Sequence, residues 1–487
     1  MQQDLLGSKW FAFLSFALLF TTVVLFAYTG KYVLLIAPVA LLFILLMMLN
    51  WKLAYWILLF SIPFSTDLDL INGSLSTSVP DEPIVWLFLL LFVLLWARKP
   101  DIIPIWWWQN SIVLIIILQF VWLIVAVAFS TELLVSVKFL LAKVWMLVAF
   151  FILPVFIIRK KKDIKKAFLV ILVPLVMTMV IIIYRHWKIG FSFIKIQRAI
   201  DPLYYNHVDY SAVMSMIFPI LFVTYSLVRG KWLLRNFLIL LIVFFFIAIY
   251  LTYARAAMIA VVFSFIIYLG IRLKIVKWVM PVFYGLIALL LTFMISNKQY
   301  MIYRPNFNET YMHKTFTEHM IATLRGRDMS SMERLYRWIA SIRMSTDNPV
   351  VGVGPNAFYY HYKSYAVTSF RTYVSRNTER STTHNYFLFM LVEQGWPAMI
   401  LYAILIMLLF AQAQKIYYRF HDRFYKKCTL GIAMLIAAAF INNFFSELYE
   451  THKVGALFYL AVALLVILDK KSKEEENLRN SETSMLS

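Results

Sequence analysis

The sequence predicts an all-α, polytopic membrane protein: a bundle of 12 to 14 transmembrane helices with one large, partly helical periplasmic loop. Of its 487 residues, 62% are hydrophobic, 17% are aromatic and only 15% are charged, a balance that soluble domains do not have. Long apolar runs follow one another along the chain, most of them close to the roughly 20 residues that a membrane span needs. Lysine and arginine concentrate in alternate short connections between these runs.

Fourteen apolar runs are candidate spans. The first is not expected to be a cleaved signal peptide, because no small-residue cleavage site follows it and another run begins at once. The run 51–64 is short, so the region 31–64 leaves the count between 12 and 14. The runs are residues 10–28, 31–49, 51–64, 83–97, 110–129, 134–158, 167–184, 210–228, 236–252, 256–272, 277–295, 385–411, 428–444 and 454–469.

The orientation follows from the basic clusters, since lysine and arginine favour the cytoplasmic side of short loops. With 14 spans, every cluster and both termini fall on that side. Much of the net charge of +21 is then explained by topology, and nucleic acid is not an expected partner. The clusters are Arg98–Lys99, Arg159 to Lys166, Arg229 to Arg235, Arg272 to Lys277, Lys415 to Lys427 and Lys470 to Lys473.

This reading divides the chain into four parts. Residues 1–295 form an N-terminal transmembrane bundle of about 11 spans, with a shorter periplasmic loop at 185–209. Residues 296–383 form the large periplasmic loop, 384–469 the C-terminal transmembrane helices, and 470–487 a solvated cytoplasmic tail. The single cysteine, Cys428, excludes an internal disulfide or a cysteine-based metal site and is predicted to be inert.

The large loop is basic, with 12 lysines and arginines against 6 acidic residues. A basic domain over the outer face favours an anionic substrate, although ordinary surface charge would give the same count. Within the loop, "DMSSMERLYRWIASIRMSTDNP" predicts a helix with a capping box at Ser330 and Glu333. Its apolar face would lie on the membrane surface or cap a cavity between spans; the residues of that face are Met332, Leu335, Tyr336, Ile339 and Ile342. The sequence "GVGPN" after it predicts a tight turn.

Two polar residues stand where spans meet the outer face. Arg255, in "YLTYARAAMIA", and His384, in "RSTTHNYFLFM", each begin a helix expected to run inward. Two helix N-termini at one level, each with a polar side chain, suit a phosphate group. A helix N-terminus also favours the neutral imidazole that a general base needs. The alternatives are an arginine that reaches the lipid headgroups and an interfacial histidine held by a neighbouring helix.

Glu393 is predicted to have a structural role. It lies nine residues after His384, which at about 100° per residue places it on the opposite face of a straight helix. The break at Gly395–Pro397 comes after Glu393 and does not change this. We therefore expect Glu393 to tie its helix to another span and not to orient His384.

These segments carry a resemblance to a known family. "HNYFLFMLVEQGWPAMIL", "LTYARAAM" and "MERLYRWIASIRMSTDNPVVGVGPNAF" resemble the signature segments of the O-antigen ligase and polymerase superfamily. The resemblance extends from about Asn206 to Trp396, whereas the N-terminal spans match only in architecture. Ala254 and Ala256 flank Arg255 where family members commonly have serine and glycine, so this motif departs from the pattern.

The resemblance implies transfer of a glycan from undecaprenyl diphosphate to an acceptor hydroxyl on the periplasmic face of a bacterial inner membrane, in lipopolysaccharide or polysaccharide biosynthesis. His384 would deprotonate the hydroxyl, with Asn385 beside it in the motif. Arg255 would hold the diphosphate, with help from Arg198 in the shorter loop, and Arg334 is a further candidate for the same anion. No cofactor or metal is expected, since the histidines of the large loop have no carboxylate partners at ligand spacing.

Several functions remain open at this stage. The acceptor can be the lipid A core, a growing surface polysaccharide or a protein hydroxyl. A different class, a flippase for lipid-linked glycans, also has 12 to 14 spans and basic interior residues. Such transporters are usually built from repeats and bind near the midplane. Here the charges lie at the outer boundary beside a large loop, which favours the transferase.

Overall fold

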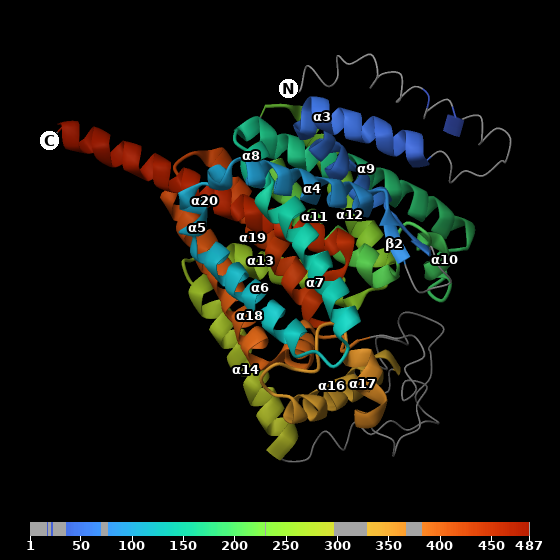
Figure 1. Cartoon of the computed structure of the whole chain (residues 1–487). Coiled ribbons are helices and arrows are strands. Elements are labelled where there is room, and N and C mark those ends of the chain that lie inside the picture. Colours follow the sequence, from blue (N-terminus) through green and yellow to red (C-terminus); the bar gives the residue numbers. More distant parts are fainter. Residues whose placement is uncertain are drawn as a thin grey trace.

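The computed structural model of the chain describes residues 17, 21, 22, 36–69, 76–228, 230–296, 329–366 and 382–486. They form an almost entirely helical bundle with one short β-hairpin (Figure 1). The first elements in chain order are α3 (Ile36–Ser61), η2 (Ile62–Phe64), β1 (Thr66–Asp69), β2 (Ser76–Val79), α4 (Asp81–Arg98), η3 (Pro100–Ile102), α5 (Ile105–Trp108), α6 (Ser111–Ala128), α7 (Leu133–Leu147), η4 (Val148–Ile152), α8 (Pro154–Ile157) and α9 (Lys161–Lys188). The remaining elements are α10 (Ile196–Ile200), α11 (His207–Leu227), α12 (Trp232–Leu251), α13 (Arg255–Arg272), α14 (Val276–Ser296), α16 (Met329–Asp347), α17 (Phe358–Tyr365), α18 (Tyr386–Arg419), α19 (Arg423–Phe444), η7 (Leu448–Glu450) and α20 (His452–Leu486).

Eleven helices in the described part of the chain are long and apolar enough to cross a membrane. The chain is therefore an all-α polytopic membrane protein, as predicted. Helix α4 has a similar length, 18 residues, but carries charged residues at both ends. The predicted run 10–28 lies almost entirely outside the described residues.

The region 31–64, which left the span count open, is described from residue 36. There the two apolar runs form one element, α3, with a kink at Asn50, and they give one candidate span, Ala40–Phe64. The side chain of Asn50 accepts a hydrogen bond from the backbone N–H of Leu53 at 3.1 Å, which caps the restarted helix beyond the kink. The polar residue between the two apolar runs, Asn50, therefore marks a bend within one helix and not a loop between two spans.

Helix α19 lies in the interior of the bundle and packs against α11, α13 and α18 (Figure 1). Ala437, Ala438 and Ala439 are fully buried, and such small side chains let neighbouring helix backbones approach closely. Phe263 of α13 and Phe440 of α19 have ring centroids 5.8 Å apart. Because α13 and α19 run in opposite directions, this pair fixes the level of the start of α13 against the end of α19.

Helix α18 reverses direction inside its own length. Gly395 has a φ of +77° and a ψ of 175°, which breaks the helix. The rings of Tyr386 and Tyr402 lie on either side of this break, and their centroids are only 4.7 Å apart. A straight helix would separate these residues by about 24 Å at 1.5 Å per residue. Residues 386–394 thus form a short half-helix that folds back against the start of the long helix beyond the break.

The segment predicted to be external, residues 296–383 (the external segment), is described over 329–366, and the predicted helix in it is present as α16. Its buried face differs from the predicted one, since Ile342 is 45% exposed. Tyr336 is buried as predicted, and the other buried side chains of the described part of this helix are Arg337, Ala340, Ser341, Met344 and Ser345. They pack toward α17 and α18, so this helix covers the bundle. At the other end of the chain, residues 470–486, expected as a solvated tail, continue α20 without a break.

Candidate active site

His384 lies directly before the half-helix of α18, in a left-handed backbone conformation with a φ of +53°. The next residue, Asn385, caps the half-helix: its side-chain oxygen accepts a hydrogen bond from the backbone N–H of Leu388 at 3.0 Å. The Asn385 amide nitrogen donates to the carbonyl of Phe444 at 3.0 Å. Asn385 therefore fixes His384 against the end of α19. These two hydrogen bonds explain physically why an asparagine beside His384 would support it, as the motif suggested.

The direction of this half-helix corrects the prediction for His384. The half-helix runs toward the break at Gly395, and the long helix beyond the break runs back past it. The helix that begins at Arg255 and the half-helix that follows His384 therefore do not both run inward, contrary to the prediction. His384 and the break lie at opposite ends of the half-helix, about 13 Å or more apart. The N-terminus of the half-helix still points at His384, because His384 directly precedes the capping residue Asn385. The expected effect of the helix dipole on the imidazole is thus retained.

Glu447 faces His384 from the connection between α19 and α20. Its Oε1 lies 3.8 Å from Nδ1 of His384, and both side chains are largely enclosed. Burial raises the pKa of the Glu447 carboxyl, while the Thr382 hydroxyl and the positive charges of α16 act in the opposite direction. Glu447 was not among the predicted site residues, although "SELYE" places two carboxylates in one short connection at the predicted outer face.

The second carboxylate of that connection has other partners. Glu450 forms an ion pair with Lys143 of α7 at 2.6 Å, and it accepts a hydrogen bond from the Tyr386 hydroxyl at 2.7 Å. These contacts hold the connection between α19 and α20 against α7 and α18. Glu447 is left as the carboxylate that faces His384. Glu450, which forms the ion pair, is therefore structural, whereas Glu447 belongs to the candidate site.

Two arginines of α16 complete the surroundings of His384. Burial lowers the pKa of His384 well below 6.5, and the positive charges of Arg337 and Arg334 lower it further. Arg337 is 3% exposed. The two arginines are three residues apart and therefore share one face of the helix. Arg334 was a predicted site residue; Arg337 was not, although the spacing of the two on one helix could have indicated it.

The segment after α16 is held on the break in α18 by backbone hydrogen bonds. Val353 donates to the carbonyl of Val392 at 2.9 Å, and Gly354 donates to that of Glu393 at 3.0 Å. Trp396 in turn donates to the carbonyl of Pro349 at 3.0 Å. A Cβ at Gly395 would lie 1.8 Å from the carbonyl oxygen of Val350. Glycine is thus required there by space as well as by its positive φ.

Glu393 belongs to this junction. Its Oε2 accepts a hydrogen bond from the backbone N–H of Asn356 at 2.6 Å, and its Oε1 accepts one from Phe358 at 3.4 Å. The side chain is fully buried. Its partner is therefore the turn of the external segment and not another span, which corrects the predicted contact. This is a structural tie between the two elements that carry His384 and the arginines.

The structure places the remaining predicted arginines differently. Arg255 is the first residue of α13, eight residues before Phe263 of the Phe263–Phe440 pair. Because Glu447 follows the end of the antiparallel α19, Arg255 and Glu447 lie toward the same end of the bundle. Arg198 lies in α10 and is exposed, and its backbone carbonyl accepts a hydrogen bond from the Arg185 side chain at 3.2 Å. Helix α10 packs against α9 and α11 and lies well apart from α16 in Figure 1. Arg198 is therefore not brought together with the arginines of α16 in this structure.

Comparison with known proteins identifies part of this region. No curated protein matches the chain. Residues 239–403 match the family model described as O-antigen ligase. The matched range contains Arg255, Arg334, Arg337, His384 and Glu393, whereas Arg198 and Glu447 lie outside it. The match supports membership of the chain in the O-antigen ligase superfamily.

Proposed function

We propose that the chain transfers a glycan from undecaprenyl diphosphate to an acceptor hydroxyl, with His384 as the general base. Glycan transfer of the O-antigen ligase or polymerase type is the family-level function that the match supports. The observation that carries the finer proposal is that His384 lies 3.8 Å from one carboxylate, Glu447, and within the electrostatic influence of two arginines of α16. This arrangement provides a base together with cations for a leaving diphosphate.

In this proposal Glu447 orients the base. Its carboxylate faces Nδ1, which leaves Nε2 free to accept the proton of the acceptor hydroxyl. The distance of 3.8 Å exceeds that of a hydrogen bond, and catalytic contacts commonly shorten once substrate is bound. The carboxylate also stabilises the imidazolium that forms. Glu447 is thus a positioning residue that acts through His384.

The bonding changes balance without a metal or a cofactor. The hydroxyl proton moves to His384, and the hydroxyl oxygen attacks the anomeric carbon as the bond from that carbon to the diphosphate oxygen breaks. The undecaprenyl diphosphate leaves with the electron pair, and Arg334, Arg337 and Arg255 stabilise its charge. A single displacement of this kind inverts the anomeric centre.

The arginines also adjust the base to the presence of donor. Without donor, the positive charges of Arg334 and Arg337 hold the pKa of His384 down. A bound diphosphate compensates these charges and lets the pKa of His384 rise. A base of higher pKa accepts a proton more readily, so the imidazole becomes stronger only after the donor has arrived. This order protects the site from reaction before both substrates are present.

The proposed location is a bacterial inner membrane, with the site on the periplasmic side and both termini in the cytoplasm. The donor would enter from the bilayer, and the acceptor would be the lipid A core, another surface glycan or a protein hydroxyl. The test is to incubate the purified protein with a lipid-linked oligosaccharide and each acceptor class in turn, and to detect the joined product by mass spectrometry. His384→Ala serves as the matched blank. Absence of product with every acceptor, with the donor intact, would reject the transferase.

A further inference from the structure

A cavity lies at the opposite end of the bundle from His384. Its volume is about 520 Å³, and residues from three separate parts of the chain line it: 99–106 between α4 and α6, 155–159 at the end of α8, and 467–474 of α20. Helix α20 begins at His452, and Lys470 follows about 27 Å further along it. The cavity is therefore distinct from the candidate active site, and the proposal below does not depend on glycan transfer.

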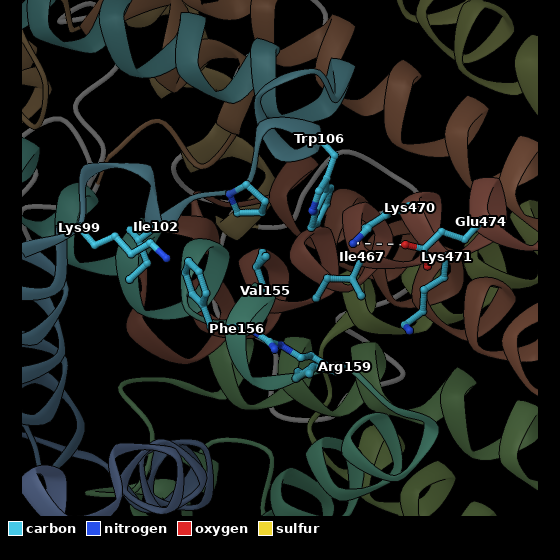
Figure 2. Close-up of a pocket in the computed structure, with 12 residues that line it drawn as sticks. Lys99, Ile102, Trp106, Val155, Phe156, Arg159, Ile467, Lys470, Lys471 and Glu474 are labelled. Carbon is cyan, nitrogen blue, oxygen red and sulfur yellow. Dashed lines mark ion pairs between the residues drawn. The ribbon is translucent and has the colours of Figure 1, made fainter.

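Positive charge dominates this cavity. Figure 2 shows Lys99, Arg159, Lys470 and Lys471 around its rim. The carboxylate in the lining is Glu474, which pairs with Lys470 at 3.3 Å. Within the described residues, the side chains of the other three cations form no ion pair. Four positive groups against one carboxylate leave a surplus of three positive charges.

The rest of the lining is apolar and aromatic. The ring of Trp106 lies 4.9 Å from Nζ of Lys470, and Phe156 and Ile467 line the wall next to it (Figure 2). Directly beside the cavity, α5 exposes Ile105 by 75% and Trp108 by 50%. In a membrane protein, exposed side chains of this kind face lipid, and tryptophan favours the level of the headgroups. The cavity thus joins a cationic centre to a lipid-facing apolar surface.

Topology alone does not account for this arrangement. The preference for lysine and arginine on one side of the membrane acts through their number near span ends. It does not require cations from distant parts of the chain to meet around one hollow. Here the end of α4, the end of α8 and the middle of α20 each contribute, and an apolar wall completes the site. Basic pockets between helices are suited to anionic lipid headgroups.

We propose that this cavity binds the phosphate headgroup of an anionic phospholipid. The phosphodiester would lie among Lys99, Arg159 and Lys471, with Lys470 held at the edge by Glu474. The acyl chains would follow the exposed apolar surface of α5 into the bilayer. The bound lipid would join α5, α8 and α20 at one end of the bundle and stabilise the assembled helices.

The test is a lipid titration of the purified full-length protein in a zwitterionic detergent, followed by thermal unfolding and by native mass spectrometry. Phosphatidylglycerol should raise the melting temperature with dose and remain bound in the gas phase, whereas phosphatidylcholine should do neither. Neutralising Lys99, Arg159 and Lys471 to glutamine should weaken phosphatidylglycerol binding by about 100-fold, at roughly 1 kcal/mol per cation. Equal stabilisation by inorganic phosphate would show a site for free phosphate and would overturn the lipid proposal.

A charge-matched control separates the cavity from general surface charge. Lys162, Lys231 and Lys277 are exposed, are predicted on the same side of the membrane, and lie outside the cavity lining. Changing these three to glutamine removes the same charge and should leave phosphatidylglycerol binding unchanged. A similar loss of binding in the control and in the cavity variant would contradict a defined site. Purified protein is used because neutralising these residues in cells would also disturb membrane orientation.

Discussion

His384 and Glu447 face one another across 3.8 Å, from Nδ1 to Oε1, although they belong to separate connections of the bundle. Asn385 fixes the first to the end of α19 through the carbonyl of Phe444. The ion pair of Glu450 with Lys143 fixes the second. The pair is thus supported from both sides by contacts that involve neither reacting group.

His384→Ala should lower glycan transfer by about 100- to 10,000-fold, the usual contribution of a general base. Expression and thermal stability should change little, because the supporting bonds come from Asn385. The measurement is the initial rate of product formation with purified protein and lipid-linked donor. Turnover near that of the unchanged protein would remove His384 from the mechanism.

Glu447→Gln should lower the rate by about 10-fold or more, since it keeps the shape but loses the charge that supports the imidazolium. It should also move the acidic limb of the pH–rate profile to lower pH, because a nearby carboxylate favours the protonated imidazole. Glu132→Gln, in the connection between α6 and α7, is the control and should change neither quantity. An unchanged profile for Glu447→Gln would leave it a purely structural role.

Arg337→Gln should shift the same limb in the opposite direction. The positive charge holds the pKa of His384 below 6.5, so activity is expected to persist down to a pH below that value. Removing the charge should raise the pKa and move the acidic limb upward by up to about 1 pH unit. Arg343→Gln, which removes an exposed charge from the same helix, should leave the limb in place. A shift in both variants, or in neither, contradicts a local effect of Arg337.

Arg255→Ala should lose most activity, and Arg255→Lys should recover only a part. Lysine supplies a point charge but not the guanidinium fork that binds two phosphate oxygens. The readout is the Michaelis constant for the lipid-linked donor alongside the turnover number. Full activity with lysine would instead favour an arginine that contacts lipid headgroups.

Accessibility labelling distinguishes the transferase from a flippase. In a Cys428→Ala background, cysteines at Ala256 and Thr382 should react with a membrane-impermeant thiol reagent added outside intact spheroplasts, with or without donor. A transporter must open to each side in turn, so donor would then expose these positions to reagent trapped inside. Labelling from the inside that depends on donor would replace the transferase with a transporter.

Much of the fold follows from local patterns, whereas the site depends on contacts between distant residues. Apolar runs predicted the spans, and the capping and glycine–proline signals predicted α16 and the turn after it. The kink at Asn50 was not predicted, because a polar residue between two apolar runs also marks a loop. Arg255, Arg334 and His384 were found from their positions at helix ends or by resemblance. Glu447 was missed because nothing within its own connection links it to His384.

The reversal in α18 is the clearest limit of the sequence reading. The break at Gly395 was recognised, but a pattern of glycine and proline gives no angle, and the helix was taken to continue inward. The reversal depends on the segment 349–354, which occupies the space that a Cβ on Gly395 would need. Two segments with no local relationship thus determine one backbone turn. The predicted contact of Glu393 was wrong for the same reason.

The junction of residues 349–358 with residues 392–396 also determines how hybrids of this protein can be made. The half-helix that carries His384 and the helix that carries Arg334 and Arg337 both depend on it, through main-chain bonds and the buried carboxylate of Glu393. An external segment grafted from a relative would have to bring its own matching turn, or keep this one intact. The exchangeable module is therefore the external segment together with the first turns of α18, and a crossover placed at residue 383 would divide it.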